Sequence, residues 1–194
     1  MRQLSGIVAT GPDEATVEGQ SRPIFEVRGK CSIVTIGLDC DPLCVESAIH
    51  EACALRRPMV LRINSGGGVL DDVAECLVPA IRRAVVECRL VAAFLEVCHG
   101  AAYLAAVECA PIVASRSATI GHFGVRVTSR AWGSECVVAA SQEQVWNRIR
   151  ERRPRVTREI LARFADRSMS SEQAEAYGLI DGIATLPRVV AGHI

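Results

Sequence analysis

The chain has 194 residues, 22 basic and 22 acidic side chains and a hydrophobic content of 49%. This length and composition indicate a globular protein with a sizeable core, in one domain or in one domain with a small appendage. The zero net charge gives no electrostatic reason to expect binding to nucleic acid or to an anionic membrane. The apolar runs are short, well below the roughly 20 residues that a membrane span needs, so we expect no span.

The cysteines and the N-terminal residues indicate in which cellular compartment we expect the protein. The chain begins without the apolar segment of a secretory signal, and its nine cysteines show none of the paired spacings typical of a zinc site. Most of them lie within apolar runs, where a free thiol behaves as a small hydrophobic group. We therefore expect a reduced, cytoplasmic protein with no metal and no cofactor.

The first half of the chain reads as alternating strands and helices after a polar segment over 1–30, expected to form an N-terminal arm or a hairpin ahead of a domain over 31–194. Apolar, β-branched runs predict strands. These strands cover 31–36, 59–64 and 90–95. Helices are predicted between them, from Asp41-Pro42 to about Leu55 and from Gly68 to about Glu87. This order predicts an α/β fold with a largely parallel sheet.

The sequence VLRINSGGGV at 60–69 joins a buried strand to a helix through three glycines. Glycine lets the backbone take positive φ and turn its N–H groups outward, and a helix N-terminus favours negative charge. The stretch can therefore stabilise a developing anion. A tight turn that needs glycine only for its shape explains the same residues equally well.

The second half contains a further strand-to-helix junction, EVCHGAAYLAA at 96–106, whose small residues let a helix pack closely. The remaining pattern predicts extended pieces over 111–114 and 118–127, followed by a helical region over 141–165 that is broken at Pro154. After these we expect a turn over 166–169, a capped short helix from Ser170 and a strand over 179–183. Arginine is dense between Arg148 and Arg158, which we interpret as a solvated or inter-subunit face.

Three stretches resemble the ClpP and signal-peptide-peptidase (SppA-type) families of the ClpP/crotonase superfamily, over roughly residues 31–186. INSGGGV at 63–69 is similar to INSPGGSV of those families, with Gly66 in place of proline. GAAYLAA…IVASRSATIGHFGV at 100–125 is similar to SGGYYIA…IVASPSTITGSIGV, and DRSMSSEQAEAYGLID at 166–181 to RDxFLSAxEAxEYGLID. The resemblance implies a ClpP/crotonase-like spiral of βαβ units.

The resemblance also implies roles for particular residues. Gly67, with Gly68 beside it, corresponds to the first backbone donor of the oxyanion hole, and His122 and Asp166 correspond to the histidine and aspartate of a ClpP-type triad. SppA-type enzymes use a lysine instead, and Lys30, the only lysine here, lies far upstream.

The position of the nucleophile differs between the two families. Matching the SppA-type pattern puts Gly100 where the serine stands, as a lost nucleophile. Matching ClpP puts Cys98 there, followed by His99, whose N–H would complete the oxyanion hole. A helix N-terminus and a histidine both lower the pKa of a thiol, so Cys98 is a chemically sensible nucleophile.

Three functions stay open at this point. The first is a peptidase or related amide or ester hydrolase that forms a covalent acyl-enzyme on Cys98, with His122 as base and Asp166 orienting it. The second is a catalytically inactive subunit kept for assembly or peptide binding, and the third is a crotonase-like binder of acyl thioesters. The resemblance further implies a homo-oligomer, as a ring or stacked ring, a peptide or protein substrate, and an ATP-driven unfoldase as a further partner.

Overall fold

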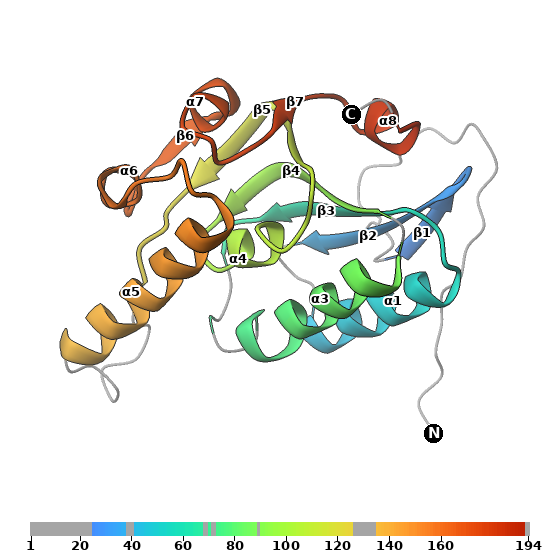
Figure 1. The fold of residues 1–194 in the computed structure, drawn as a ribbon, viewed down its shortest axis with the longest axis horizontal. Helices are drawn as coiled ribbons and strands as arrows, with labels where there is room; N and C mark the ends of the chain where they lie inside the picture. Colours follow the sequence, from blue (N-terminus) through green and yellow to red (C-terminus); the bar gives the residue numbers. More distant parts are fainter. Residues whose placement is uncertain are drawn as a thin grey trace.

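A computed structural model describes residues 25–37, 41–67, 70, 73–88, 90–125 and 135–192. Its centre is a seven-stranded sheet in the order β1-β2-β3-β4-β5-β6, with β7 beside β5 (Figure 1). The strands are β1 (Phe25–Arg28), β2 (Cys31–Gly37), β3 (Met59–Ser65), β4 (Val91–His99), β5 (Ile112–Gly121), β6 (Ser168–Ser170) and β7 (Gly182–Ile183). Because β2 to β5 are parallel, the predicted α/β fold with a largely parallel sheet is confirmed.

Helices cover both faces of this sheet (Figure 1). They are α1 (Pro42–Ala54), a π-helical turn η1 (Val73–Leu77), α3 (Val78–Glu87), α4 (Ala102–Ala106), α5 (Glu135–Arg152), α6 (Arg158–Arg163), α7 (Ser171–Ala176) and α8 (Leu186–Val190). The large core lies on the face that α1, α3 and α4 cover. On the other face α8 buries Leu186 and Val189 against a smaller apolar cluster. None of the helices in the described ranges has the length and apolar character needed to span a membrane.

Local sequence signals explain several element boundaries. Asp41 caps α1, since its carboxylate accepts the N–H of Leu43 at 3.1 Å and Pro42 occupies the first turn. Ser170 and Gln173 form a capping box at the start of α7, and Thr157 caps α6. The predicted starts of these three helices are confirmed.

Other boundaries differ from the predictions. Ser168 and Met169, predicted to belong to a turn, form β6 together with Ser170, because their backbone pairs antiparallel with the end of β5. The two extended pieces predicted over 111–127 form the single strand β5 as far as Gly121, and residues 126–127 lie outside the described ranges. The strand predicted over 179–183 is reduced to Gly182–Ile183. Within the segment expected to be an arm or hairpin, Phe25–Arg28 form an antiparallel hairpin with β2.

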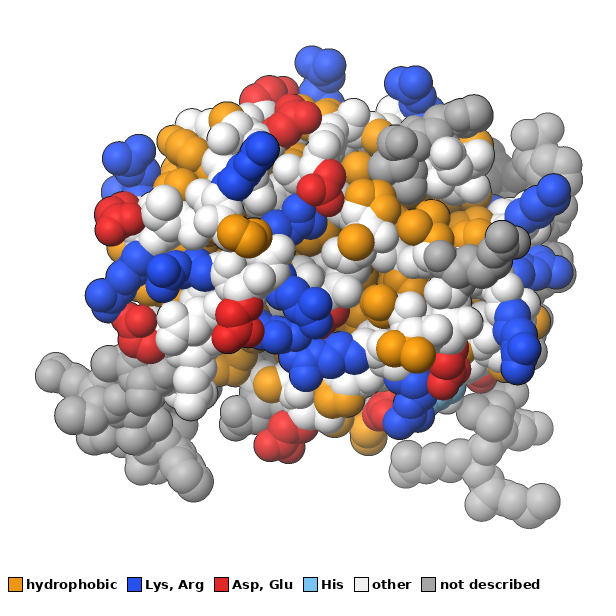
Figure 2. Space-filling view, in the orientation of Figure 1, with side chains coloured by type: hydrophobic (Ala, Val, Ile, Leu, Met, Phe, Trp, Pro, Cys, Tyr) orange, Lys and Arg blue, Asp and Glu red, His pale blue; other side chains and the backbone are white. Residues whose placement is uncertain are grey.

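The arginine-rich part of α5 was predicted to be a solvated or inter-subunit face. Several of its arginines instead form ion pairs with the rest of the domain. The fully buried carboxylate of Glu108 accepts hydrogen bonds from Arg82 of α3 and from Arg148 and Arg152 of α5. Next to them Arg153 makes two hydrogen bonds to Asp181, at 2.6 and 2.9 Å. Elsewhere on the face shown in Figure 2, side chains of both signs are interspersed with apolar ones.

Candidate functional site

The candidate site lies where the three central parallel strands end. In the register of the sheet, Ser65 of β3 pairs with Cys98 of β4, and His99 pairs with Gly121 of β5. The carboxyl ends of β3, β4 and β5 therefore meet at one edge, which is where open α/β sheets bind ligands. His122 follows β5 directly, so the fold brings His99 and His122 together at this edge.

The two histidine rings are in contact. Their centroids are 4.7 Å apart, with an angle of 55° between the ring planes. The Nε2 atom of His99 is buried and has no hydrogen-bond partner within the described part of the chain. Partial burial, followed by the neighbouring His122, lowers the pKa of His99 below its ordinary value, so its imidazole is neutral at pH 7. A neutral ring with an unpaired nitrogen is suited to accept a proton.

His122 has an unusual backbone, with φ at +51°, a region that non-glycine residues seldom occupy. Its neighbours hold it there: the His122 N–H donates to Arg167 O at 3.0 Å, and the Gly124 N–H to Ala165 O at 2.9 Å. The carbonyl of Phe123 accepts from the indole of Trp146 on α5 at 3.0 Å. Strained residues fixed from several sides are concentrated at functional sites.

Two glycines face each other beside the histidines. Gly67 has φ at +135° and Gly100 has φ at +54°. A Cβ added at Gly100 would lie 3.4 Å from His122 O and 3.8 Å from the Cα of Gly67. The close approach of the chains after β3, β4 and β5 therefore favours glycine here.

Of the predicted oxyanion donors, Gly67 is engaged in another hydrogen bond, and so is the N–H of Gly100 beside it. The Gly67 N–H points to the hydroxyl of Ser65 at 3.4 Å, and that hydroxyl donates to Gly67 O at 2.6 Å. The Gly100 N–H donates to Gly121 O at 3.0 Å. Gly68 lies outside the described residues. An oxyanion would have to displace the Ser65 hydroxyl before it could bind the N–H of Gly67. The N–H of Gly100 is used in the backbone hydrogen bonding between the ends of β4 and β5.

Cys98 lies on the other side of β4 from the histidine pair. It is 0% exposed and belongs to the large core. Burial, with a smaller contribution from Cys109, raises the pKa of its thiol far above the ordinary range. A protonated, inaccessible thiol is a poor nucleophile. The structure therefore does not support the predicted role of Cys98.

A β-bulge in β4 decides which way Cys98 points. Ile63 pairs with Leu95 but Asn64 pairs with Val97, so Glu96 is an extra residue in β4 relative to β3. The side chain of Glu96 is held by Arg62 of β3 through hydrogen bonds of 2.9 and 2.6 Å. Successive residues of a strand alternate between the two faces of the sheet. Because of the extra residue, the side chain of Cys98 lies on the same face as that of Leu95, and the side chain of His99 lies on the opposite face.

Asp166 lies in the segment whose backbone is hydrogen-bonded to the segment of His122 and Gly124. It is exposed, and its neighbours Ala165 and Arg167 are the residues whose carbonyls accept the N–H groups of Gly124 and His122. Of the predicted site residues, the structure thus brings together Gly67, His99, Gly100 and His122. The sequence assigns a role only to the N–H of His99, and the contact of its side chain with His122 is the feature of this site that the motifs did not predict.

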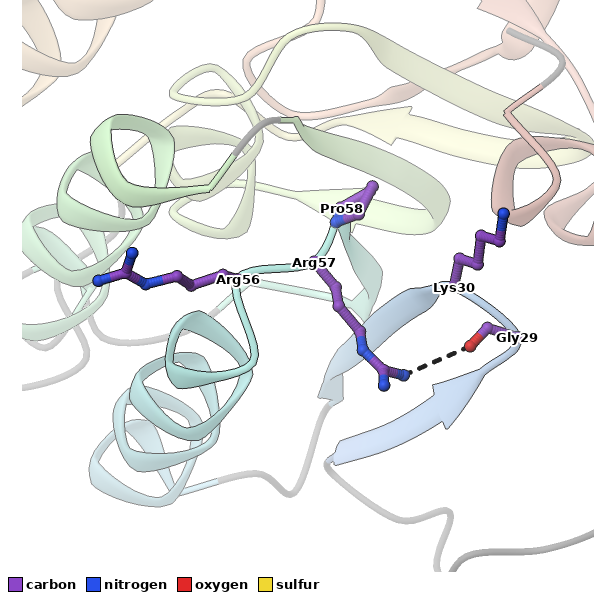
Figure 3. A pocket seen from close by; sticks show the side chains of 5 residues that line it. All are labelled: Gly29, Lys30, Arg56, Arg57 and Pro58. Atoms are coloured by element: carbon purple, nitrogen blue, oxygen red, sulfur yellow. Dashed lines mark hydrogen bonds between the residues drawn. The ribbon is translucent and has the colours of Figure 1, made fainter.

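A second feature is an open hollow of about 430 Å³. It lies at the other end of the strands, where β2 and β3 begin. Gly29, Lys30, Arg56, Arg57 and Pro58 line it. Figure 3 shows that the three cationic side chains point in different directions, with Arg57 donating to Gly29 O at 3.4 Å. They do not converge on a common point. Across the described residues, no group of three or more His, Cys, Asp or Glu side chains is arranged to hold a metal ion.

Comparisons with known proteins place the fold. No protein-family model matches the chain, and no curated protein matches it by sequence. A mutant of the 1510-N membrane-bound stomatin-specific protease in complex with a substrate peptide matches with a TM-score of 0.64 and 14% identity, over 81% of this chain and 76% of that one. A probable enoyl-CoA hydratase/isomerase from Mycobacterium abscessus matches with a TM-score of 0.61 and 14% identity, over 86% and 70%.

A third solved structure, methylmalonyl CoA decarboxylase, matches with a TM-score of 0.58 and 12% identity, over 90% of this chain and 73% of that one. Together, these likenesses show that the chain has the ClpP/crotonase fold, as its motifs predict. At such low identity the similarity concerns the fold and not a particular activity.

Proposed function

We propose that this chain hydrolyses an amide or ester bond by general acid–base catalysis, with His99 and His122 as the pair that transfers protons. The observation that carries the proposal is the buried, unpartnered Nε2 of His99 in a ring that contacts His122. Buried polar atoms without a partner are rare in folded proteins and require an explanation. In this proposal the partly exposed ring of His99 turns when a substrate binds, so that Nε2 meets the substrate or its attacking water.

The proposed step uses water rather than a thiol as the nucleophile. Neutral His99 accepts a proton from the water through Nε2 while the water oxygen attacks the carbonyl carbon. The imidazolium then protonates the leaving amine or alkoxide, which returns His99 to the neutral form that the neighbouring His122 favours. A well-placed base of this kind contributes about 10²- to 10⁴-fold in rate. The covalent acyl-enzyme expected from the sequence is replaced because Cys98 is 0% exposed.

The test is the hydrolysis of p-nitrophenyl esters and of fluorogenic peptide amides by the wild type and by His99→Gln and His122→Gln. We expect each variant to lose on the order of 100-fold or more in kcat/KM. His50→Gln is the matched control, since His50 lies on the exposed side of α1 beside Glu46, away from the strand ends, and its loss should leave the rate unchanged. Equal rates for His99→Gln and wild type would rule the mechanism out.

The pH dependence gives a second readout of the same mechanism. Because the pKa of His99 is lowered from its ordinary value of 6.5, the base form persists below neutral pH. We expect kcat/KM to begin its fall on acidification at a lower pH than it would with an ordinary histidine as the base. A rate that already halves near pH 7 would contradict His99 as the base.

A catalytically inactive subunit is the second candidate, and the engaged N–H groups of Gly67 and Gly100 favour it. It predicts no hydrolysis above background for the wild type, with peptide binding retained. Acyl-thioester binding is distinguished by a thermal shift with coenzyme A. Self-assembly, a peptide or protein substrate, an unfoldase partner and a cytoplasmic location stay predictions, and light scattering after size exclusion measures the first of them.

A further inference from the structure

Two thiols meet where α1 and α3 end. Cys53 lies in the last turn of α1, and Cys88 directly follows α3. Their sulfur atoms are 3.7 Å apart although the residues are separated by 35 positions in the chain. Both are free thiols, with 6% and 7% of their surfaces exposed. We infer that Cys53 and Cys88 form a redox-sensitive pair, which peroxide oxidises to a disulfide that joins α1 to α3.

The geometry favours a bond between these two sulfurs. A separation of 3.7 Å is van der Waals contact, so no other atom lies between them. A disulfide requires about 2.05 Å, which rotation about χ1 provides when the Cβ atoms are suitably placed. The backbones on both sides are fixed by hydrogen bonds, from Arg56 N–H to Cys53 O at 2.9 Å and from Cys88 N–H to Ala84 O at 2.8 Å. Each helix end is therefore fixed by its own backbone hydrogen bonds before oxidation.

The reaction balances with hydrogen peroxide as the oxidant. One sulfur attacks a peroxide oxygen, the O–O bond breaks, and the product is a sulfenic acid and one water. The second sulfur then attacks the sulfenic sulfur, an S–S bond forms, the S–O bond breaks and a second water leaves. Two thiol protons end in the waters and two electrons pass to the peroxide. A low-molecular-weight thiol reverses the reaction by exchange.

The surroundings of the pair make this oxidation slow. Burial raises the pKa of Cys53 to about 12, with Cys88 and Glu87 acting in the same direction and Arg83 against it. Exposed Cys44 therefore meets peroxide more readily. The proximity of a second sulfur, rather than a reactive thiolate, distinguishes the Cys53–Cys88 pair. The pair lies at the edge of the sheet opposite to the histidines, so the inference does not depend on the proposed function.

The experiment oxidises the reduced full-length protein with hydrogen peroxide, blocks the remaining thiols with iodoacetamide and digests it after glutamate. The peptides 52–75 and 88–96 each contain a single cysteine. We expect them to be recovered as one linked species that is two hydrogen masses lighter than the pair and separates on reduction. Cys53→Ala and Cys88→Ala should each abolish it, and Cys44→Ser, the matched control, should leave it unchanged.

Thermal unfolding supplies an independent measurement. Closing a loop of this length raises Tm by about 5–10 °C in a protein of this size, and dithiothreitol should remove the increase. Recovery of peptides 52–75 and 88–96 as separate alkylated species, under conditions that oxidise Cys44 fully, would overturn the inference. So would a link from either cysteine to a different one. A linked pair without a rise in Tm would overturn the stabilising role.

Discussion

Cys98 and His99 are consecutive residues in very different environments. The thiol is sealed in the core, where burial raises its pKa, and the imidazole lies at the rim of the sheet against His122. Reactivity depends on the thiolate and on access to it. At this strand end the thiol of Cys98 is therefore closed to reagents, whereas the imidazole of His99 is partly exposed.

This contrast predicts the order in which the cysteines react. With iodoacetamide near neutral pH, exposed Cys44 should be alkylated within minutes and Cys98 only at the rate of unfolding. Peptide mapping over a time course, with and without denaturant, measures both rates. Fast labelling of Cys98 in the native protein would restore the acyl-enzyme mechanism expected from its sequence position.

At the scale of elements, β4 and its bulge decide the composition of the site. The Arg62 and Glu96 side chains pair across β3 and β4 at 2.6 Å and are 12% and 28% exposed. A two-bond pair in such a partly buried position is stronger than a surface ion pair. It fixes the extra residue at position 96 and with it the orientation of His99.

Removing this pair should disturb the site from a distance. We expect Glu96→Ala to lower the free energy of unfolding by about 1–3 kcal/mol, because Arg62 loses its acceptor. The NMR signals of His99 and His122 should shift as well. Urea denaturation and histidine-selective spectra are the measurements. Glu143→Ala breaks the more exposed pair with Arg158 and, as control, should cost no more than about 1 kcal/mol and leave these signals in place.

The bulge also explains how far the sequence could predict the structure. Apolar periodicity and capping residues such as Asp41 and Ser170 were sufficient for most strands and helices, because those signals are local. The face of the sheet on which Cys98 lies was not predictable, because strict alternation from Leu95 would put its side chain on the opposite face. Likewise β6 forms only because Gly121 lets residues 167–168 approach, a contact between distant segments.

At the scale of the whole molecule, the carboxylates of Glu108 and Asp181 join elements that are distant in the sequence. Burial alone would raise the pKa of Glu108, but hydrogen bonds from Arg82 and Arg148 and nearby charges outweigh it and hold the pKa below the ordinary value. The hydrogen bond from Arg153 does the same for Asp181, which also accepts the N–H of Ile112 at 2.7 Å. Both carboxylates therefore stabilise the folded state only while ionised.

These lowered pKa values predict loss of stability in acid. The contribution of both groups is fully present above their unfolded-state pKa values, near pH 4, and disappears as pH falls through the lower folded-state values. Urea midpoints should therefore be steady from pH 7 to 5 and decline below about pH 4. Glu108→Gln should cost about 3 kcal/mol or more at pH 7, because three arginines lose a buried anion, and should flatten the decline. Glu175→Gln, at an exposed side chain, should do neither.

The extra residue at position 96 has a consequence for how proteins of this fold diversify. Gain or loss of one residue in the middle of this strand exchanges a thiol for an imidazole at the carboxyl end of the sheet without any amino-acid replacement. Changes in strand length are thus a source of new chemistry in their own right, independent of point substitution. Alignments that count positions from the neighbouring motifs assign the wrong side chain to this face of the sheet whenever such an insertion lies between them.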